Sequence, residues 1–399
     1  MKTKLAILSL AGLLANPALA DVQINGFANL IGGMTLDDDE SVYDYDSDFS
    51  FDPASVFGLQ VRGEVSDKLS ATAQLVGRGR DDYDADFEWA YMTYMLNNNV
   101  NISAGRLRMP LFKYSASLDI GYSYHWLTPP DAVYGIDFNN IDGVRIDYMN
   151  YSGDWEYGAQ LTMGRVEADT TISGTPAALE LENVVAASFE ATRDWFSART
   201  LFARGKTSAA NADFDTFVGG LNQYGAFIPS ASLAAEGLSV NEDTGTFFEV
   251  AVDIDKYDWF VGAEFTQTEV DGSVIADNKA WYVTAGMRFG KFTPHITYEV
   301  EEADNGAQLG LIAALPPTIA TGDAVVDATW NGANGQAGIY QTAAGIAAQQ
   351  ELDVSAVTVG LRYDVEPGFA LKTDVTWYSD DLNDLNDATL LKVGVNYTF

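Results

Sequence analysis

The last ten residues of the chain alternate between apolar and polar side chains and end on an aromatic residue. One face carries Leu391, Val393, Val395, Tyr397 and Phe399, and the other carries Lys392, Gly394, Asn396 and Thr398. A period of two residues is that of a β-strand, and a strand with one apolar face separates an apolar medium from a polar one. Two-sided strands therefore constrain the fold more than any other feature of the sequence.

The same alternation recurs in sixteen segments. They cover residues 22–33, 54–65, 69–80, 85–96, 100–108, 141–151, 155–166, 182–192, 195–204, 244–254, 258–269, 280–289, 291–300, 352–365, 368–378 and 389–399. Most have about the 9–11 residues with which a tilted strand crosses a bilayer. We therefore predict an all-β fold, a 16-stranded antiparallel transmembrane β-barrel.

The connections between these segments alternate between short and long. The short ones are 66–68, 97–99, 152–154, 193–194, 255–257, 290 and 366–367, and the long ones are 34–53, 81–84, 109–140, 167–181, 205–243, 270–279, 301–351 and 379–388. The short ones contain the Asp, Asn, Gly and Pro residues that close hairpins. Transmembrane barrels keep short periplasmic turns and longer extracellular loops, so this rhythm supports the prediction. Within 301–351, residues 338–350 could form a short helix.

Charged side chains collect on one face of the predicted strands. In 54–65, Arg62 and Glu64 lie opposite Phe57 and Leu59, and in 368–378, Lys372 and Asp374 lie opposite Leu371. In 85–96, strict alternation places Phe87, Trp89 and Tyr91 opposite Glu88, Met92 and Tyr94. A charge facing lipid at the bilayer midplane costs ~2–4 kcal/mol, so the polar face should line water. A sixteen-stranded barrel is also too wide for strand side chains alone to fill.

The N-terminal segment differs from the rest of the chain. Residues 1–20 contain Lys2 and Lys4, an apolar run over 5–14, and Ala18-Leu19-Ala20 before Asp21. This pattern is typical of a cleaved signal peptide. Its apolar run is shorter than the about 20 residues of a membrane-spanning helix. We predict an exported chain with one domain, residues 21–399.

Composition narrows the function classes. The chain has 21 Phe, 20 Tyr, 8 Trp and no Cys, so aromatic residues are abundant and disulfide bonds are excluded. Without Lys2 and Lys4, 20 basic residues stand against 57 acidic ones, a formal net charge of −37. Nucleic acids are bound by Lys and Arg, so a nucleic-acid partner is not expected. Such a chain should instead attract cations and repel anions.

Taken together, the strand count, the loop rhythm and the terminal Phe399 resemble those of the general porins of Gram-negative outer membranes. The resemblance implies a passive diffusion channel for small hydrophilic solutes and ions, usually a homotrimer, lying in the outer membrane among lipopolysaccharide. It also implies that Phe399 is part of the signal read by the barrel-assembly machinery. From the charge we expect a preference for cations.

The resemblance points to residues 109–140 as the third loop, which in this family folds into the barrel and narrows the pore. Its acidic residues face a ladder of arginines on the opposite wall. The candidates in the loop are Asp119, Asp131, Asp137, Tyr122 and Tyr124, and those in the basic wall are Arg62, Arg78, Arg80, Arg106, Arg108 and Arg145. Arg106 and Arg108 share the parity of Ile102 and Ala104, so an inward position for them requires a bulge near Gly105.

Other functions are less well supported. The acidic stretch 37–52 lacks a recognised calcium-ligand spacing and reads as a solvated loop, although divalent ions could bridge it to lipopolysaccharide phosphates. His125 and His295 are the only histidines and no Gly-x-Ser-x-Gly elbow is present, so we expect no catalytic site, metal or cofactor. A channel selective for one nutrient such as a sugar, and a plugged structural barrel, remain open alternatives.

Overall fold

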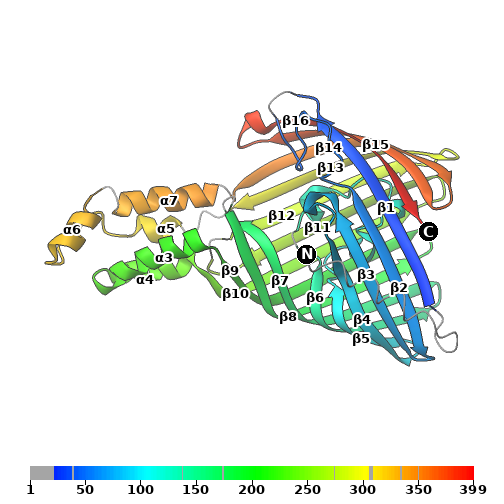
Figure 1. Ribbon diagram of the computed structural model, residues 1–399, viewed down its shortest axis with the longest axis horizontal. Coiled ribbons are helices and arrows are strands. Elements are labelled where there is room, and N and C mark those ends of the chain that lie inside the picture. The colour runs from blue at the N-terminus through cyan, green and yellow to red at the C-terminus, as the bar shows by residue number, and fades with distance from the viewer. Residues whose placement is uncertain are drawn as a thin grey trace, which may run out of the picture.

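The computed structural model describes residues 22–37, 40–136, 138–172, 175–273, 275–304, 309–332, 335–348 and 350–399. Over these residues, sixteen antiparallel strands close into one barrel, in which each strand pairs with its sequence neighbours and the last pairs with the first (Figure 1). The strands are β1 (Val22–Thr35), β2 (Val56–Ser66), β3 (Leu69–Arg78), β4 (Ala85–Asn97), β5 (Val100–Arg108), β6 (Asn140–Ser152), β7 (Trp155–Ile172), β8 (Thr175–Arg193), β9 (Phe196–Ala210), β10 (Val240–Asp255), β11 (Trp259–Val270), β12 (Asp277–Met287), β13 (Phe292–Asp304), β14 (Leu352–Glu366), β15 (Phe369–Asp380) and β16 (Ala388–Thr398). The predicted fold class and strand count are confirmed. Residues 1–20, the predicted signal peptide, lie outside the described residues.

The barrel closes between its first and last strands. Phe27 pairs with Thr398 and Thr35 pairs with Leu390. Beyond β16, the backbone of Phe399 exchanges two hydrogen bonds with Gly26, at 2.9 and 3.0 Å. Every strand therefore has two neighbours, so over the described residues the sheet has no edge strand.

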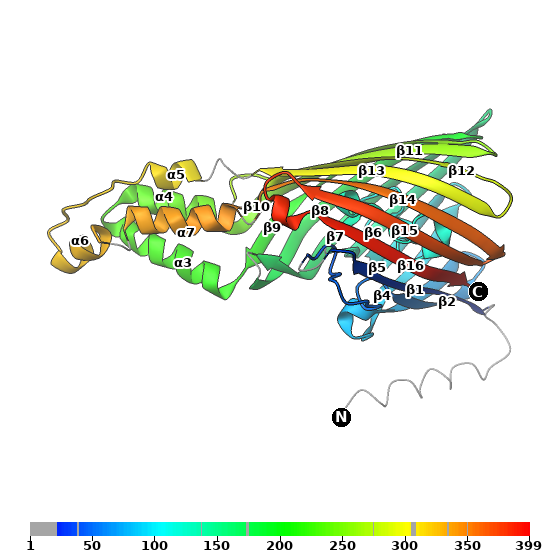
Figure 2. The ribbon, with the colours of Figure 1, turned by 90° about the horizontal axis from the view of Figure 1, so that it is seen from above.

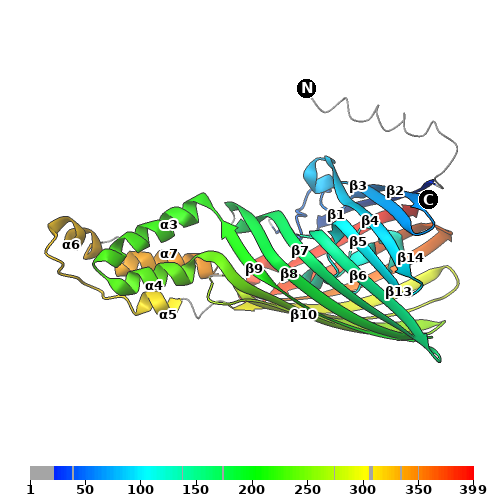
Figure 3. The same ribbon diagram turned by 90° about the horizontal axis from the view of Figure 1, so that it is seen from below.

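The two ends of the barrel differ in their connections. The C-terminus and the short turns lie at the end away from the helices, and the helices project from the opposite end (Figure 2). The prediction of a long connection over residues 167–181 is wrong. Residues 166–172 and 175–181 continue the pairing of β7 with β8, so these strands are longer than expected. Figure 3 shows β7 to β10 running along one side of the barrel toward the helices.

The outer surface of the barrel is apolar. Large apolar side chains at the outward positions of the strands are exposed, among them Leu59, Phe202, Val250, Ile296 and Leu371. The alternate residues of the same strands face the lumen and include Gln60, Glu249 and Lys372. Such a wall has an apolar side for lipid and a polar side for water, as a transmembrane barrel requires. No helix among the described residues is long and apolar enough to cross a membrane.

Two long connections fold into helices at the outer end. The β9–β10 connection forms α3 (Ala212–Gln223) and α4 (Pro229–Leu238), and the β13–β14 connection contains α5 (Leu309–Ala313), α6 (Ala324–Trp330) and α7 (Gln336–Ala348). Their buried apolar side chains form a separate cluster that includes Leu221, Leu238, Ile312 and Trp330. The predicted helix over 338–350 corresponds to α7. These connections were too long to be structureless in a compact fold, and their Ala-rich sequences pack against each other instead.

Candidate functional site

The connection between β5 and β6, residues 109–139, folds into the barrel. It contains two short 3₁₀ turns, η4 (Ser115–Ser117) and η5 (Gly121–Ser123), and the single-turn helix α2 (Asp131–Tyr134). Its atoms contact lumen-facing residues on both sides of the barrel, from Asn29 on β1 to Glu264 on β11. We call residues 109–139 the lumen loop. The prediction of a third loop that folds inward is confirmed.

Four charged side chains clamp the lumen loop to β3, β4 and β5. The Arg108 guanidinium donates to Glu88 and to Asp119 at 2.6 Å each, and Arg78 donates to the same two carboxylates at 3.0 and 2.9 Å. The Arg108 and Asp119 side chains are only 5% and 10% exposed. We call Arg78, Glu88, Arg108 and Asp119 the charged clamp. Burial opposes ionisation of Asp119, but the guanidinium groups of Arg108 and Arg78 outweigh it and hold the pKa of this carboxyl below its usual range.

A β-bulge delivers one member of this clamp. The pairing of β3 with β4 shifts register between Gln74 and Leu75, because Trp89 pairs with Gln74 whereas Phe87 pairs with Leu75. Glu88 is the extra residue, so Glu88 and Trp89 both face the lumen. The predicted facing of 85–96 is therefore wrong beyond Glu88. Tyr91 packs toward the lumen loop, and Met92 and Tyr94 are exposed on the outer face.

Basic residues of the last three strands hold the middle of the lumen loop. The Lys372 Nζ donates to the carbonyl oxygens of Gly121, Tyr124 and Trp126 at 2.6, 2.8 and 2.6 Å. Arg362 donates to the carbonyls of Tyr122 and Tyr124 at 2.8 Å each, and its guanidinium lies 4.5 Å from the centre of the Tyr122 ring. Asp374 accepts a hydrogen bond from the backbone N–H of Leu127 at 2.8 Å. These strand side chains satisfy loop backbone groups that a helix or sheet would otherwise pair.

The opposite wall of the barrel adds a large apolar contact to its polar contacts with the loop, in which Arg199 donates to the carbonyls of Pro110 and Leu111 and Asp253 pairs with Lys113. One buried cluster joins the loop to β5–β12; it contains Leu107, Met109, Leu111, Phe112, Tyr124, Trp126, Val133, Tyr134, Ile141, Val166, Val184, Ala186, Leu201, Ala203, Phe247, Ala280 and Tyr282. We call this set the lumen core. Glu264 lies at its margin and accepts from the Tyr134 and Tyr282 hydroxyls at 2.5 and 3.1 Å. The lumen of this half is therefore packed, not an open polar surface as the strand pattern predicted.

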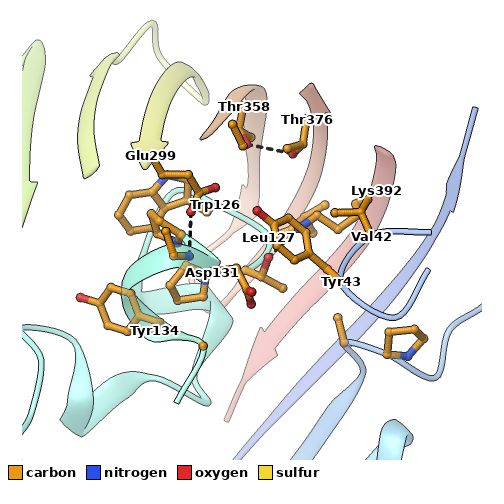
Figure 4. Close-up of a pocket in the computed structure, with 18 of the residues that line it drawn as sticks. Val42, Tyr43, Trp126, Leu127, Asp131, Tyr134, Glu299, Thr358, Thr376 and Lys392 are labelled. Atoms are coloured by element: carbon orange, nitrogen blue, oxygen red, sulfur yellow. Dashed lines mark hydrogen bonds between the residues drawn. The ribbon is translucent and has the colours of Figure 1, made fainter. Parts of the chain in front are cut away.

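Cavities lie on both sides of the lumen loop, toward the end of the barrel that carries the helices. The first, of about 620 Å³, is bordered by the lumen loop, the connection between β1 and β2, and strands β13 to β16. Figure 4 shows Trp126, Leu127 and Asp131 of the loop around it, together with Tyr43, Glu299 and Lys392. The backbone N–H of Ala132 donates to Glu299 at 3.1 Å, which fixes the start of α2 against β13. We call this space the polar cavity. The second is about 440 Å³ and lies between the lumen loop and β7–β13.

The structure places the predicted site residues in different surroundings. Arg78, Arg108 and Asp119 come together in the charged clamp, and Tyr122 and Tyr124 lie in the loop segment held by Arg362. Arg62 is an exposed lumen residue, and Arg145 pairs with Asp147 at 3.0 Å. Arg80 and Asp131 border the polar cavity. A role in a constriction stays a prediction for all of them, and Asp137 lies outside the described residues.

The inward position expected for Arg106 is wrong. Leu107 is fully buried in the lumen core, so its neighbour Arg106 belongs to the outer face, where it pairs with Asp142 at 3.0 Å. Both of these side chains are 45% exposed. The pairing of Arg106 with Ala90 is continuous through Gly105, so no inward displacement occurs there. Only Arg108, at the end of β5, turns into the lumen.

Several residues that hold the loop were not among the candidates. Glu88, Arg362 and Lys392 contact the loop or its partners, although the predicted basic wall came only from the first third of the chain. The inward parity of Lys372 and Asp374 was correctly predicted, and it was the available signal for the C-terminal wall. No group of His, Asp and Glu side chains among the described residues has the arrangement of a metal site.

Searches for relatives by sequence and by structure gave different results. No family model matches the chain, and no curated protein matches it in sequence. Solved structures do match over almost its whole length. OmpF of Salmonella typhi, solved with daunomycin, has 14% identity, covers 95% of this chain and 97% of its own, and has a TM-score of 0.57. The outer membrane channel DcaP of Acinetobacter baumannii has 13% identity, coverages of 96% and 99% and a TM-score of 0.56.

A third similar structure is the anion-selective porin of Comamonas acidovorans, with 13% identity, coverages of 95% and 100% and a TM-score of 0.53. These proteins share the barrel fold with this chain. At such identities the likeness concerns the fold, and residue roles have to be argued from this chain itself.

Proposed function

We propose that this protein is a channel of the Gram-negative outer membrane through which small hydrophilic solutes and ions diffuse passively. The observation that carries this proposal is a closed barrel with an apolar outer wall and a loop folded across its lumen. An apolar outer wall suits lipid, and a polar lumen narrowed by a fixed loop suits transfer of hydrated solutes. The outer-membrane porins and channel that share this fold support the same conclusion.

The proposal includes cation preference. A net charge of −37 for residues 21–399 makes the barrel repel anions near its mouths. The arginines of the charged clamp do not offset this, because each is already paired with two carboxylates. One protein of the same fold is an anion-selective porin, so the fold by itself does not decide the preference.

The proposal also concerns the oligomeric state and the membrane environment of the channel. We expect a homotrimer in a membrane that contains lipopolysaccharide, as one trimeric outer membrane protein of the same fold, from Vibrio cholerae, suggests. Phe399 would serve as the residue read by the barrel-assembly machinery. Its pairing with Gly26 at the closing seam fits a residue that must be placed correctly before the barrel is complete.

The purified protein in a planar bilayer tests the proposal directly. We expect stepwise conductance in KCl and, across a tenfold KCl gradient, a reversal potential of the sign that a cation-preferring pore gives. A reversal potential of the opposite sign would refute cation preference. Complete absence of conductance steps would refute the channel, and would favour a plugged structural barrel or a barrel enzyme.

A second candidate is a channel selective for one nutrient such as a sugar. The observation in its favour is the lining of the polar cavity, where rings of Tyr43, Tyr124, Trp126 and Tyr378 lie near carboxylates. Aromatic faces and carboxylates are suited to sugar rings and their hydroxyls. Saturable block of the conductance by a sugar would favour this candidate, whereas flux proportional to sugar concentration would favour simple diffusion.

A further inference from the structure

The second outer cavity has a lining unlike that of a path for polar solutes. Its volume is about 440 Å³, and apolar side chains dominate its wall; we call it the apolar cavity. They include Leu111, Phe138, Leu181, Phe247 and Val270. Pockets of about 300–1,000 Å³ with mostly apolar walls and a few polar groups are the usual form of small-molecule sites. An apolar wall offers no hydrogen bonds or charges to a hydrated ion, so it is better suited to a ligand with an apolar part.

The apolar cavity adjoins the polar cavity. Five residues border both spaces, namely Ala132, Gly135, Ile136, Glu301 and Leu352. Three of them belong to α2 or the residues just after it, so the lumen loop forms part of the wall between the two cavities. A ligand with an apolar body and a polar head can therefore place each part against a matching wall.

Acidic side chains gather at this boundary. Glu301 borders both cavities, and its Oε1 accepts a hydrogen bond from Asn278 at 2.6 Å. Glu299 lies two residues away on the same face of β13, and Asp131 faces the same polar cavity. Arg204 is the cationic residue that borders the apolar cavity, but it alternates with the lumen residues Ala203 and Gly205, so its side chain belongs to the outer face.

The cations of the polar cavity are largely engaged by other groups. Arg78 is held by Glu88 and Asp119, and the Lys392 Nζ donates to Thr128 at 2.6 Å. Arg80 lies 4.0 Å from Asp81 and is 53% exposed, so water screens it. An ammonium group placed at the shared boundary would stabilise the ionised form of Glu299, Glu301 and Asp131, whereas an anionic head would oppose it. The boundary therefore favours a positively charged head over a negative one.

We propose that this channel binds a small amphiphilic organic cation where the two cavities meet. Its aromatic or short aliphatic body would lie in the apolar cavity and its ammonium group at Glu301. This proposal rests on the channel function proposed above and names a ligand class for it. Bound there, the cation would narrow the path past the lumen loop, so its binding should be visible as a reduction of ion current.

The test uses the full-length protein in planar bilayers of fixed composition. The probe is phenylethylammonium added on the side of the long loops, and the controls are methylammonium, which has the charge without the ring, and phenylacetate, which has the ring with the opposite charge. We expect saturable block by phenylethylammonium alone among the three. Replacing Glu301 by Gln should weaken the block by at least about tenfold, as expected for loss of one charged hydrogen bond.

Glu302→Gln is the matched control, because Glu302 is the next residue of β13 and points to the outer face. It should leave the block unchanged. Leu181→Ser should weaken the block by phenylethylammonium, because it makes the apolar wall polar. Each variant should first show stepwise conductance in KCl, which shows that the barrel has folded, and its block is then expressed relative to its own open-channel current.

The failures of the two proposals are distinguishable. Conductance in KCl without block by phenylethylammonium, or with equal block by all three probes, would overturn the ligand proposal and leave the channel intact. Equal affinity of Glu301→Gln and Glu302→Gln would also overturn it. Absence of any conductance would instead refute the channel itself.

Discussion

The lumen loop meets two unlike walls. Toward β3–β5 and β14–β16, it is held by directional contacts, the charged clamp and the hydrogen bonds of Lys372 and Arg362. Toward β6–β12, the large apolar contact of the lumen core is added to fewer polar contacts, chiefly those of Arg199 and Glu264. The first kind of contact fixes where the loop sits, because charged hydrogen bonds have strict geometry. The second kind supplies non-directional free energy that grows with buried apolar area.

The largest expected effect comes from breaking the directional wall at Arg108. Replacing Arg108 by Met leaves the buried carboxylates of Glu88 and Asp119 short of a partner, which should cost about 3–5 kcal/mol of the free energy that holds the loop. The loop should then leave its place, and single-channel conductance should rise and become noisy. Arg106→Met is the control, since this side chain lies on the outer face of the same strand. Equal conductance of the two variants would contradict the role of the charged clamp.

A smaller effect is expected on the apolar wall. Phe112 is nearly fully buried and packs against Tyr134 and Phe247, with ring centroids 4.8 and 5.7 Å apart. Replacing it by Ala should cost about 3 kcal/mol through lost contacts and a cavity. Hydrogen exchange of the loop amides should quicken, and the change should be independent of salt concentration. A strongly salt-dependent change would mean that charge, not packing, dominates this wall as well.

The smallest effect is expected from mild acid. The pKa of Asp119 is held below its usual value, so the stabilisation it gives is complete above the pKa of an unfolded Asp, about 3.9, and is lost only as the pH falls through the lower folded value. The contribution of Asp119 to loop closure should thus be the same at pH 7 and pH 5. The conductance difference between the wild type and Asp119→Asn measures this contribution. A difference that shrinks between pH 7 and pH 5 would contradict it.

The barrel fold could be predicted from the sequence because the alternation within each segment identifies a strand independently of the others. The facing of Leu371 against Lys372, for example, depends only on alternation within one segment and the cost of placing charge in lipid. The extension of β7 and β8 was missed because residues 167–181 carry acidic side chains that read as a loop. Residues 166–172 and 175–181 nevertheless form strands, because they pair with each other.

The site was harder to predict because its contacts depend on distant register. A one-residue bulge at Glu88 moves the side chains that follow it, such as Trp89 and Tyr91, to the face opposite to the one that strict alternation predicts. No residue type marks that bulge. Likewise, Lys372 could be assigned to the lumen, but its three partners are backbone carbonyls about 250 positions earlier. Alternation predicts which side of the barrel wall a residue faces, but it does not predict which atom of the lumen loop that residue contacts.

The seam between β1 and β16 has a consequence for the order of events in biogenesis. Phe27 finds Thr398 only after all the intervening strands are in place, so the wall cannot be completed while the chain is still being delivered. Until then, the first strand offers free N–H and C=O groups to any passing strand. A barrel that still lacks β16 therefore exposes one edge of β1 and one edge of β15, and both are covered only when the last strand pairs with them.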